Sequence, residues 1–351
     1  MYLNVLKVFT PSALAFFIGL MLAPILTDFL YKHKLWKKKA GKIDPSGKET
    51  PIFNSLHKEK EVGTPRMGGV LIWVSVLCTI GIIYLLTILF PGDEFFLKLN
   101  FLSRGQTWLP LFTLLVGSLV GLVDDILQVT GNGDGKCGLS FWKRVSVVII
   151  LGLIGGFWFY NRLGMTATHI PFYGPLELGI LFIPFFIIVM LGLFSSGVVD
   201  GLDGLSGGVM AIVFSAYAGI SYFQGRIDLA AFCTVVVGGI LAFLWFNIPP
   251  ARFYMSETGI LGLTTTLTVV AFLTDSVVIL PVIAFPLFIT SASVVIQLTS
   301  KKFRHGKKVF KVAPLHHHFE AIGWPSYKVV MRYWVIGIIM AIMGMVIALI
   351  G

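Results

Sequence analysis

Charged residues are scarce in this chain: Asp, Glu, Lys and Arg make up 13% of its 351 residues, while 56% are hydrophobic. Soluble domains carry about 25% charged residues, so this composition excludes an ordinary soluble fold. Cysteine is rare as well. The three cysteines are scattered and show neither a disulfide framework nor the spacing of a zinc site. What the chain does have is a series of long apolar runs.

These runs recur along the whole length and predict an all-α polytopic membrane protein, a single integral membrane domain over residues 1–351. A β-barrel would show alternating segments of about ten residues, and these runs do not alternate. The first run is too long for a signal peptide, so we expect it to be retained as a span. Ten spans are predicted, near residues 7–31, 67–90, 107–128, 144–161, 176–195, 205–222, 229–246, 258–273, 278–298 and 330–350.

Lys and Arg are shared unevenly between alternate loops. The loop 32–66 holds ten and the loop 299–329 holds seven, whereas the opposite loops 91–106, 162–175 and 223–228 hold four in total. The positive-inside rule therefore predicts cytoplasmic basic loops and places both termini outside the cytoplasm.

Five carboxylates fall at the same predicted boundary as the basic loops. Asp124 and Asp125 end the third predicted span, and Glu257 opens the eighth. Asp200 and Asp203 open the sixth and are three residues apart, which predicts one shared helix face. A helix cap is an equal interpretation for Asp200. Asp124 and Asp125 lie near a helix C-terminus, where the dipole repels anions, and so predict a bound cation such as Mg²⁺.

Three consecutive histidines, His316 to His318, lie in the last cytoplasmic loop, and we expect them in exposed positions. Imidazole could bind a transition metal there or help to cap the tenth span. We favour contact with a polar substrate through His316 and His317, because histidine donates hydrogen bonds to phosphate and sugar oxygens. His318 is expected to pack structurally.

Several motifs occur in the order found in one enzyme family. They are Gly63-Thr-Pro-Arg-Met-Gly-Gly69, Asp124-Asp125, Asp200-Gly-Leu-Asp-Gly204, Asn247-x-x-Pro-Ala251 and Ala313-Pro-Leu-His-His-His-Phe-Glu320 with Gly323-Trp324. The chain resembles the polyprenyl-phosphate N-acetylhexosamine-1-phosphate transferases along essentially its whole length. The histidine motif is similar to that of the muramoyl-pentapeptide branch rather than of relatives that use N-acetylglucosamine.

The resemblance implies a reaction. Phospho-N-acetylmuramoyl-pentapeptide passes from its UDP-linked form to undecaprenyl phosphate, giving lipid I and UMP for peptidoglycan synthesis. It also implies Mg²⁺ as cofactor, the bacterial cytoplasmic membrane as location, an active site on the cytoplasmic face, a homodimer, and no nucleic acid partner.

Roles for individual residues follow from the same resemblance. Glu257 would be the direct metal ligand. Asp124 would take the proton from the lipid phosphate, and Asp125 would help to organise the site; a covalent aspartyl route stays open. His316 is counted among the catalytic residues and, with His317, among the substrate contacts. The remaining nucleotide and sugar contacts would be Lys60, Thr64, Asp200, Asp203, Asn247 and Tyr254.

Some positions depart from the family pattern. Glu257 stands where the family has Asp, and Gln128 where it has Lys. Ser195-Ser-Gly-Val-Val199 replaces an Asn-rich stretch, and the basic residue after Gly138-Leu-Ser140 is either Lys143 or Arg144. These departures leave a degenerate, inactive homologue as one alternative. The others are a transferase for UDP-N-acetylglucosamine and a transporter with intramembrane carboxylates. Finally, the prolines at 281 and 286 predict a kink in the ninth span that could shape a groove for the lipid tail.

Overall fold

The computed structural model describes residues 2–38, 62–102, 105–131 and 138–351. Its elements, in chain order, are α1 (Tyr2–Lys32), α3 (Val70–Leu89), α4 (Glu94–Leu99), α5 (Gly105–Thr130), α6 (Phe141–Arg162), β1 (Ala167–Ile170), β2 (Gly174–Glu177), η1 (Gly179–Leu181), α7 (Phe182–Ser195), η2 (Ser196–Val199), α8 (Leu205–Phe223), α9 (Ile227–Asn247), α10 (Ser256–Leu273), α11 (Leu280–Ile283), α12 (Phe285–Phe303), α13 (Leu315–Ala321) and α14 (Ser326–Ile350).

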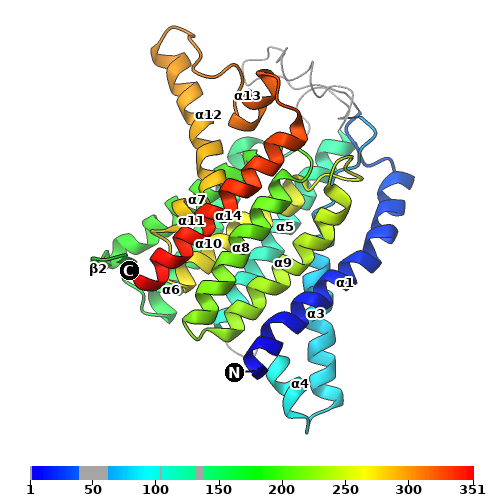
Figure 1. Ribbon diagram of the computed structural model, residues 1–351, viewed down its shortest axis with the longest axis vertical. Helices are drawn as coiled ribbons and strands as arrows, with labels where there is room; N and C mark the ends of the chain where they lie inside the picture. Colours follow the sequence, from blue (N-terminus) through cyan, green and yellow to red (C-terminus); the bar gives the residue numbers. More distant parts are fainter. Residues whose placement is uncertain (1, 39–61, 103–104, 132–137) are drawn as a thin grey trace.

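The predicted all-α membrane fold is confirmed. Within the described residues, nine helical segments are long and apolar enough to cross a bilayer, and they coincide with nine of the ten predicted spans. They pack side by side as a bundle (Figure 1). Two features were not predicted. The short helix α4 follows α3, and an antiparallel hairpin of β1 and β2 lies between α6 and α7.

The predicted ninth span, 278–298, is wrong as a single apolar helix. The chain forms the short helix α11, breaks at Ala284, and continues as α12, which leans away from the bundle (Figure 1). Pro281 and Pro286 stand in the first turns of these two helices, so the predicted kink is present as a break. The polarity of α12 has a structural reason: Ser293, Gln297 and Ser300 are buried and hydrogen-bond the loop that leads to α13.

The centre of the bundle is α10. Of its most apolar 18 residues, 94% are buried, against 22% in α1 and α14, which lie at the periphery. The hydroxyls of Thr264, Thr265, Thr266 and Thr268 donate to carbonyls of the preceding turn; that of Thr264, for example, donates to the carbonyl of Ile260 at 2.8 Å. Because α10 is enclosed by protein, a polar group at its first turn can be held away from lipid.

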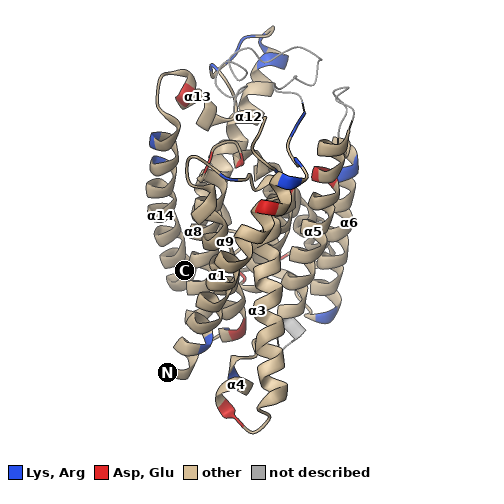
Figure 2. Cartoon of the chain, turned by 90° about the vertical axis from the view of Figure 1, so that its right-hand side faces the viewer, with Lys and Arg blue, Asp and Glu red and all other residues tan. Residues whose placement is uncertain are grey.

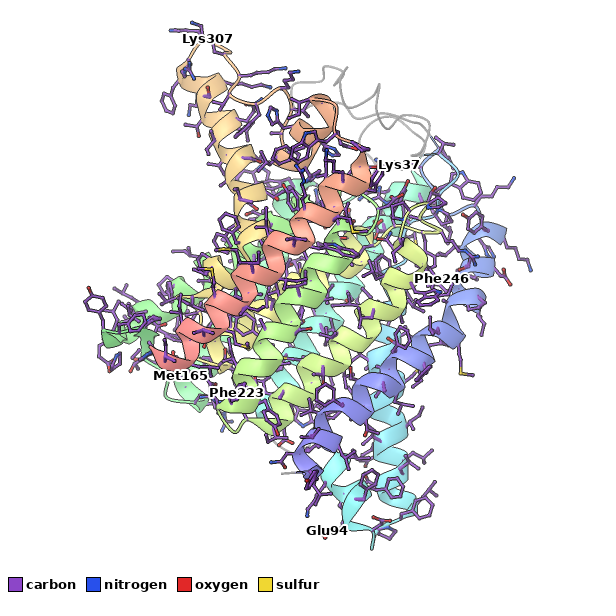
Figure 3. All side chains as sticks on the ribbon, viewed as in Figure 1. Lys37, Glu94, Met165, Phe223, Phe246 and Lys307 are labelled. Carbon is purple, nitrogen blue, oxygen red and sulfur yellow. The ribbon has the colours of Figure 1, made fainter. Side chains whose placement is uncertain are left out.

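The bundle has two distinct ends. At one end, Lys7 of α1 pairs with Asp228 of α9, and the backbone N–H of Phe172 in the hairpin donates to the carbonyl of Gly351 at 3.0 Å. Both chain ends therefore lie at this end, away from α13 (Figure 1). Most Lys and Arg gather at the other end (Figure 2). Figure 3 labels Lys37 and Lys307 toward that basic end and Glu94 at the opposite one.

Candidate active site

The first turn of α10 lies against α5 with almost no space between the two backbones. A Cβ built on Gly121 of α5 would lie 2.7 Å from the backbone nitrogen of Thr258 and closer still to the carbonyl of Glu257. One turn deeper, a Cβ on Gly117 would lie 2.9 Å from the Cα of Gly262. Small residues at facing positions permit this approach. The same seam brings the aspartate pair of α5 beside Glu257.

Asp125 is fully buried and held by three donors. The backbone N–H and the hydroxyl of Thr258 donate to its Oδ2 at 2.9 and 2.6 Å, and Arg66 Nε donates to its Oδ1 at 3.3 Å. A carboxylate can remain buried only when it is paired and hydrogen-bonded in this way. Asp125 is thus fixed by α10 and by the segment before α3.

Asp124 and Glu257 share one cation. Arg144 Nη1 bonds to Glu257 Oε1 and lies 3.6 Å from Asp124 Oδ2. Asp124 also accepts hydrogen bonds from the backbone N–H of Leu139 and, at 2.9 Å, from Gln128 Nε2. Of the two basic residues left open by the sequence, Arg144 is therefore the one at the carboxylates, whereas Lys143 is exposed.

The segment before α3 is tied to the segment before α10. Tyr254 donates its backbone N–H to the carbonyl of Pro65 at 2.9 Å and accepts from the N–H of Gly68 at 2.8 Å. This pairing sets Tyr254 beside the segment that contains Thr64 and fixes the backbone that carries Arg66. Lys60, the remaining predicted contact, lies outside the described residues.

The prediction that Asp200 and Asp203 share a helix face is wrong. Both lie in the non-helical stretch between η2 and α8, whose N-cap is Gly204. Asp200 accepts from the backbone N–H of Ser256 at 2.9 Å, and Asp203 accepts from that of Ala251 at 3.3 Å. The two carboxylates therefore anchor the loop that precedes α10. Gly201 between them and Gly204, whose φ is 79°, favour a turn over a helix in this stretch.

Asn247 stands at the end of α9 and also holds this loop. Its Oδ1 accepts from the backbone N–H of Gly204 at 2.9 Å, and its Nδ2 donates to the carbonyl of Phe253 at 2.9 Å. Both ends of the amide thus join backbone segments, and the side chain is 4% exposed. Its assignment as a substrate contact stays a prediction.

The expectation that the histidines are exposed is wrong for two of them. His316 and His317 lie on the short helix α13 and are buried, at 0 and 2% exposure. A Cβ built on Gly201 would lie 3.0 Å from His317 Nε2 and nearer to His316 Nε2, so both rings rest on the Asp200–Asp203 stretch. His318 instead accepts the backbone N–H of Lys311 at 3.2 Å, which fits the structural packing predicted for it.

The carboxylates suit a hard divalent cation. Within the described ranges, no three His, Cys, Asp or Glu side chains form a ready metal cage. Mg²⁺ does not need one, since it is usually held by one or two carboxylates together with waters and substrate phosphates. Asp124 and Glu257, which already share the charge of Arg144, supply two such carboxylates.

Two residues that complete this geometry were missed by sequence reasoning. Arg66 and Thr258 meet Asp125 across 59 and 133 residues of chain. Arg66 does stand inside a motif singled out above, so its position in Gly63–Gly69 was the one available signal.

Comparison with known proteins is consistent with this arrangement. Residues 107–275, which include α10 and all but the first two residues of α5, match the family described as Glycosyl transferase family 4. Three curated relatives match over nearly the full length, and each is named phospho-N-acetylmuramoyl-pentapeptide-transferase. The chain is 33% identical to that of Anoxybacillus flavithermus (95% of each chain covered), 35% to that of a Geobacillus species (94% of each), and 32% to that of Thermodesulfovibrio yellowstonii (98% of this chain, 94% of the relative).

Proposed function

The chain belongs to the phospho-N-acetylmuramoyl-pentapeptide transferase family, and from this premise we propose the reaction that it catalyses. It transfers phospho-N-acetylmuramoyl-pentapeptide from the UDP-linked form to undecaprenyl phosphate and yields lipid I and UMP. The observation that carries the proposal is the cluster of three carboxylates at the basic end of the bundle: Asp124 and Glu257 meet at Arg144, and Asp125 beside them is held by Arg66 and Thr258. A transporter would place its carboxylates near the midplane, so this clustering at one end favours the transferase.

The basic end faces the cytoplasm of the bacterial inner membrane in this proposal. The unequal distribution of Lys and Arg between the two ends of the bundle supports that orientation. The proposed UDP-linked donor would reach the site from the cytoplasm. Both termini then lie outside the cytoplasm. A homodimer is proposed from the family resemblance alone.

The three carboxylates have different roles in the proposed reaction. Glu257, with Asp124 beside it, would hold Mg²⁺, which when bound neutralises phosphate charge and orients the reacting groups. Asp124 Oδ2, which faces Arg144, accepts the proton of the lipid phosphate so that a phosphate oxygen can attack the β-phosphate of the donor. Asp125 stays fixed by Thr258 and Arg66 and holds α5 and α10 in register. Positioning of two anions is the main task in such a transfer.

The remaining predicted contacts would complete the site around the two substrates. His316 and His317 would donate to phosphate or sugar oxygens from α13. Asp200 and Asp203 would bind nucleotide or sugar hydroxyls from the loop that they also anchor. Thr64 and Tyr254 lie where the two paired segments meet. The acceptor's lipid tail would leave the site along the face where α12 parts from the bundle (Figure 1).

The test uses purified protein with UDP-N-acetylmuramoyl-pentapeptide and undecaprenyl phosphate, with and without Mg²⁺. UMP release that requires both substrates and the cation is expected. UDP-N-acetylglucosamine serves as the matched alternative donor. UMP release with that donor and none with the muramoyl donor would move the chain to the sister activity, and release with neither would mark an inactive homologue.

A further inference from the structure

Arg66 has hydrogen-bonding capacity that its contact with Asp125 does not use. Its Nε donates to Asp125 Oδ1 at 3.3 Å, and its side chain is 18% exposed while that of Asp125 is fully buried. Within the part of the chain that the structure describes, its two terminal nitrogens make no hydrogen bond or ion pair. The guanidinium therefore presents donors toward solvent at the edge of the carboxylate cluster.

The backbone holds Arg66 from both sides. Its own N–H donates to the carbonyl of Leu35 at 2.9 Å, and the neighbouring Pro65 and Gly68 pair with Tyr254. With Nε fixed on Asp125 as well, the planar guanidinium has little freedom to turn. A guanidinium pre-oriented in this way can offer two parallel N–H groups to one phosphate.

Arg144 has less unused capacity than Arg66. Its Nη1 is engaged by both Glu257 and Asp124, and its Nε is buried without a partner, so among the described residues only its Nη2 is left, whereas Arg66 keeps both terminal nitrogens. Three carboxylates, those of Asp124, Asp125 and Glu257, face these two guanidiniums, so the formal charges of the named groups sum to minus one. An incoming anion must therefore meet a donor that the cluster has not already used, and Arg66 supplies it.

We propose that Arg66 binds the diphosphate of the nucleotide donor through its terminal nitrogens while its Nε keeps Asp125 in place. This assignment rests on the proposed function, because it takes the donor to be a uridine diphosphate ester. It makes Arg66 a residue for phosphate recognition, with no part in reading the uracil or the sugar.

The experiment measures the binding of uridine, UMP and UDP, each with Mg²⁺, to the purified full-length protein and to two variants. In Arg66→Gln, affinity for UDP should fall about ten- to a hundredfold, the scale for losing a hydrogen bond to a charged group. Affinity for uridine should not change. Arg66→Lys should recover part of the loss for UDP, because it keeps the charge but not the planar fork.

Arg304→Gln is the matched control, since Arg304 is an exposed arginine at the same end of the bundle, and it should bind all three ligands as the wild type does. Thermal unfolding of each variant reports its folded fraction. If Arg66→Gln weakens uridine, UMP and UDP by one common factor, or weakens none, Arg66 only supports Asp125 and the assignment is overturned. A selective loss of UDP binding supports the assignment even if the wild type releases no UMP, a result that would count against the proposed function alone.

Discussion

One added methyl group on Gly121 tests whether the seam between α5 and α10 sets the catalytic geometry. A Cβ there would lie 2.7 Å from the nitrogen of Thr258 and closer still to the carbonyl of Glu257. Ordinary contact begins at 3.4 Å, so the Gly121→Ala substitution must move the two helices apart by at least 0.7 Å, the difference between these distances. The atoms that it meets are backbone atoms, and no side-chain rotation can relieve the overlap.

The displacement acts directly on the candidate site, because Asp124 and Asp125 follow Gly121 by one turn and Glu257 is the residue that it touches. A misplacement of about 1 Å can cost about a hundredfold in rate, so we expect kcat to fall by roughly that factor. Overpacking should also lower the free energy of unfolding by about 1–3 kcal/mol. The loss of activity per folded molecule should thus exceed what unfolding explains.

The assay is UMP release per folded protein, with the folded fraction taken from size-exclusion chromatography and thermal unfolding. Gly81→Ala is the matched control, since Gly81 also lies in an apolar helix but a Cβ there meets nothing within 4 Å. Gly117→Ala, one turn deeper in the same seam, should destabilise the protein yet affect kcat less. If Gly121→Ala turns over as fast as Gly81→Ala, the seam does not set the positions of the carboxylates.

Four further outcomes are expected. Asp124→Asn should lower turnover at least about a hundredfold while the protein still folds; wild-type turnover would leave Asp124 with a structural role only. Glu257→Gln should abolish Mg²⁺-dependent UMP release and Glu257→Asp should retain much of it, whereas equal Mg²⁺ titrations for Gln and Glu would exclude Glu257 as a ligand. His316→Ala should lower kcat/KM and, because the ring is buried, also cost about 1–3 kcal/mol in thermal unfolding; a stability loss with intact turnover would argue against substrate contact. Cysteines placed at Lys307 and Gly92, in a protein without its native cysteines, should label from opposite sides, and labelling of position 307 from outside intact cells would reverse the topology.

The sequence predicted the spans because the bilayer imposes a simple requirement on them. A crossing helix needs about 20 apolar residues, and in the described parts of the chain nine helices meet that requirement at the expected places. The prediction of the ninth span, 278–298, failed at α12 because of contacts that lie outside any local window of sequence. Gln297 bonds to the backbone of Phe310, thirteen residues further on, and Ser293 bonds to that of Leu315. These polar side chains therefore bind the chain that follows α12 rather than forming a surface for lipid.

The candidate site was predictable in part. The sequence alone was enough to single out Asp124, Asp125 and Glu257. A carboxylate at the end of an apolar helix costs free energy, so its presence there indicates a functional role. Their partners could not be singled out, since Arg144 meets Glu257 across 113 residues and nothing in a local pattern selects it over Lys143. The burial of His316 was missed for a similar reason: its cover comes from distant segments, among them the turn at Gly201.

The charge balance of the cluster connects its fold to its chemistry. Asp124, Asp125 and Glu257 lie at the edge of the apolar bundle, where Arg66 and Arg144 pair with them. The transfer of a phospho-sugar to a lipid phosphate brings at least two further anions to the same place, and two guanidiniums already paired with three carboxylates cannot neutralise them. A divalent cation shared with Glu257 changes the net charge of the named groups from minus one to plus one. The cluster can then attract phosphates, and for that reason we expect Mg²⁺ and nucleotide to bind with positive coupling.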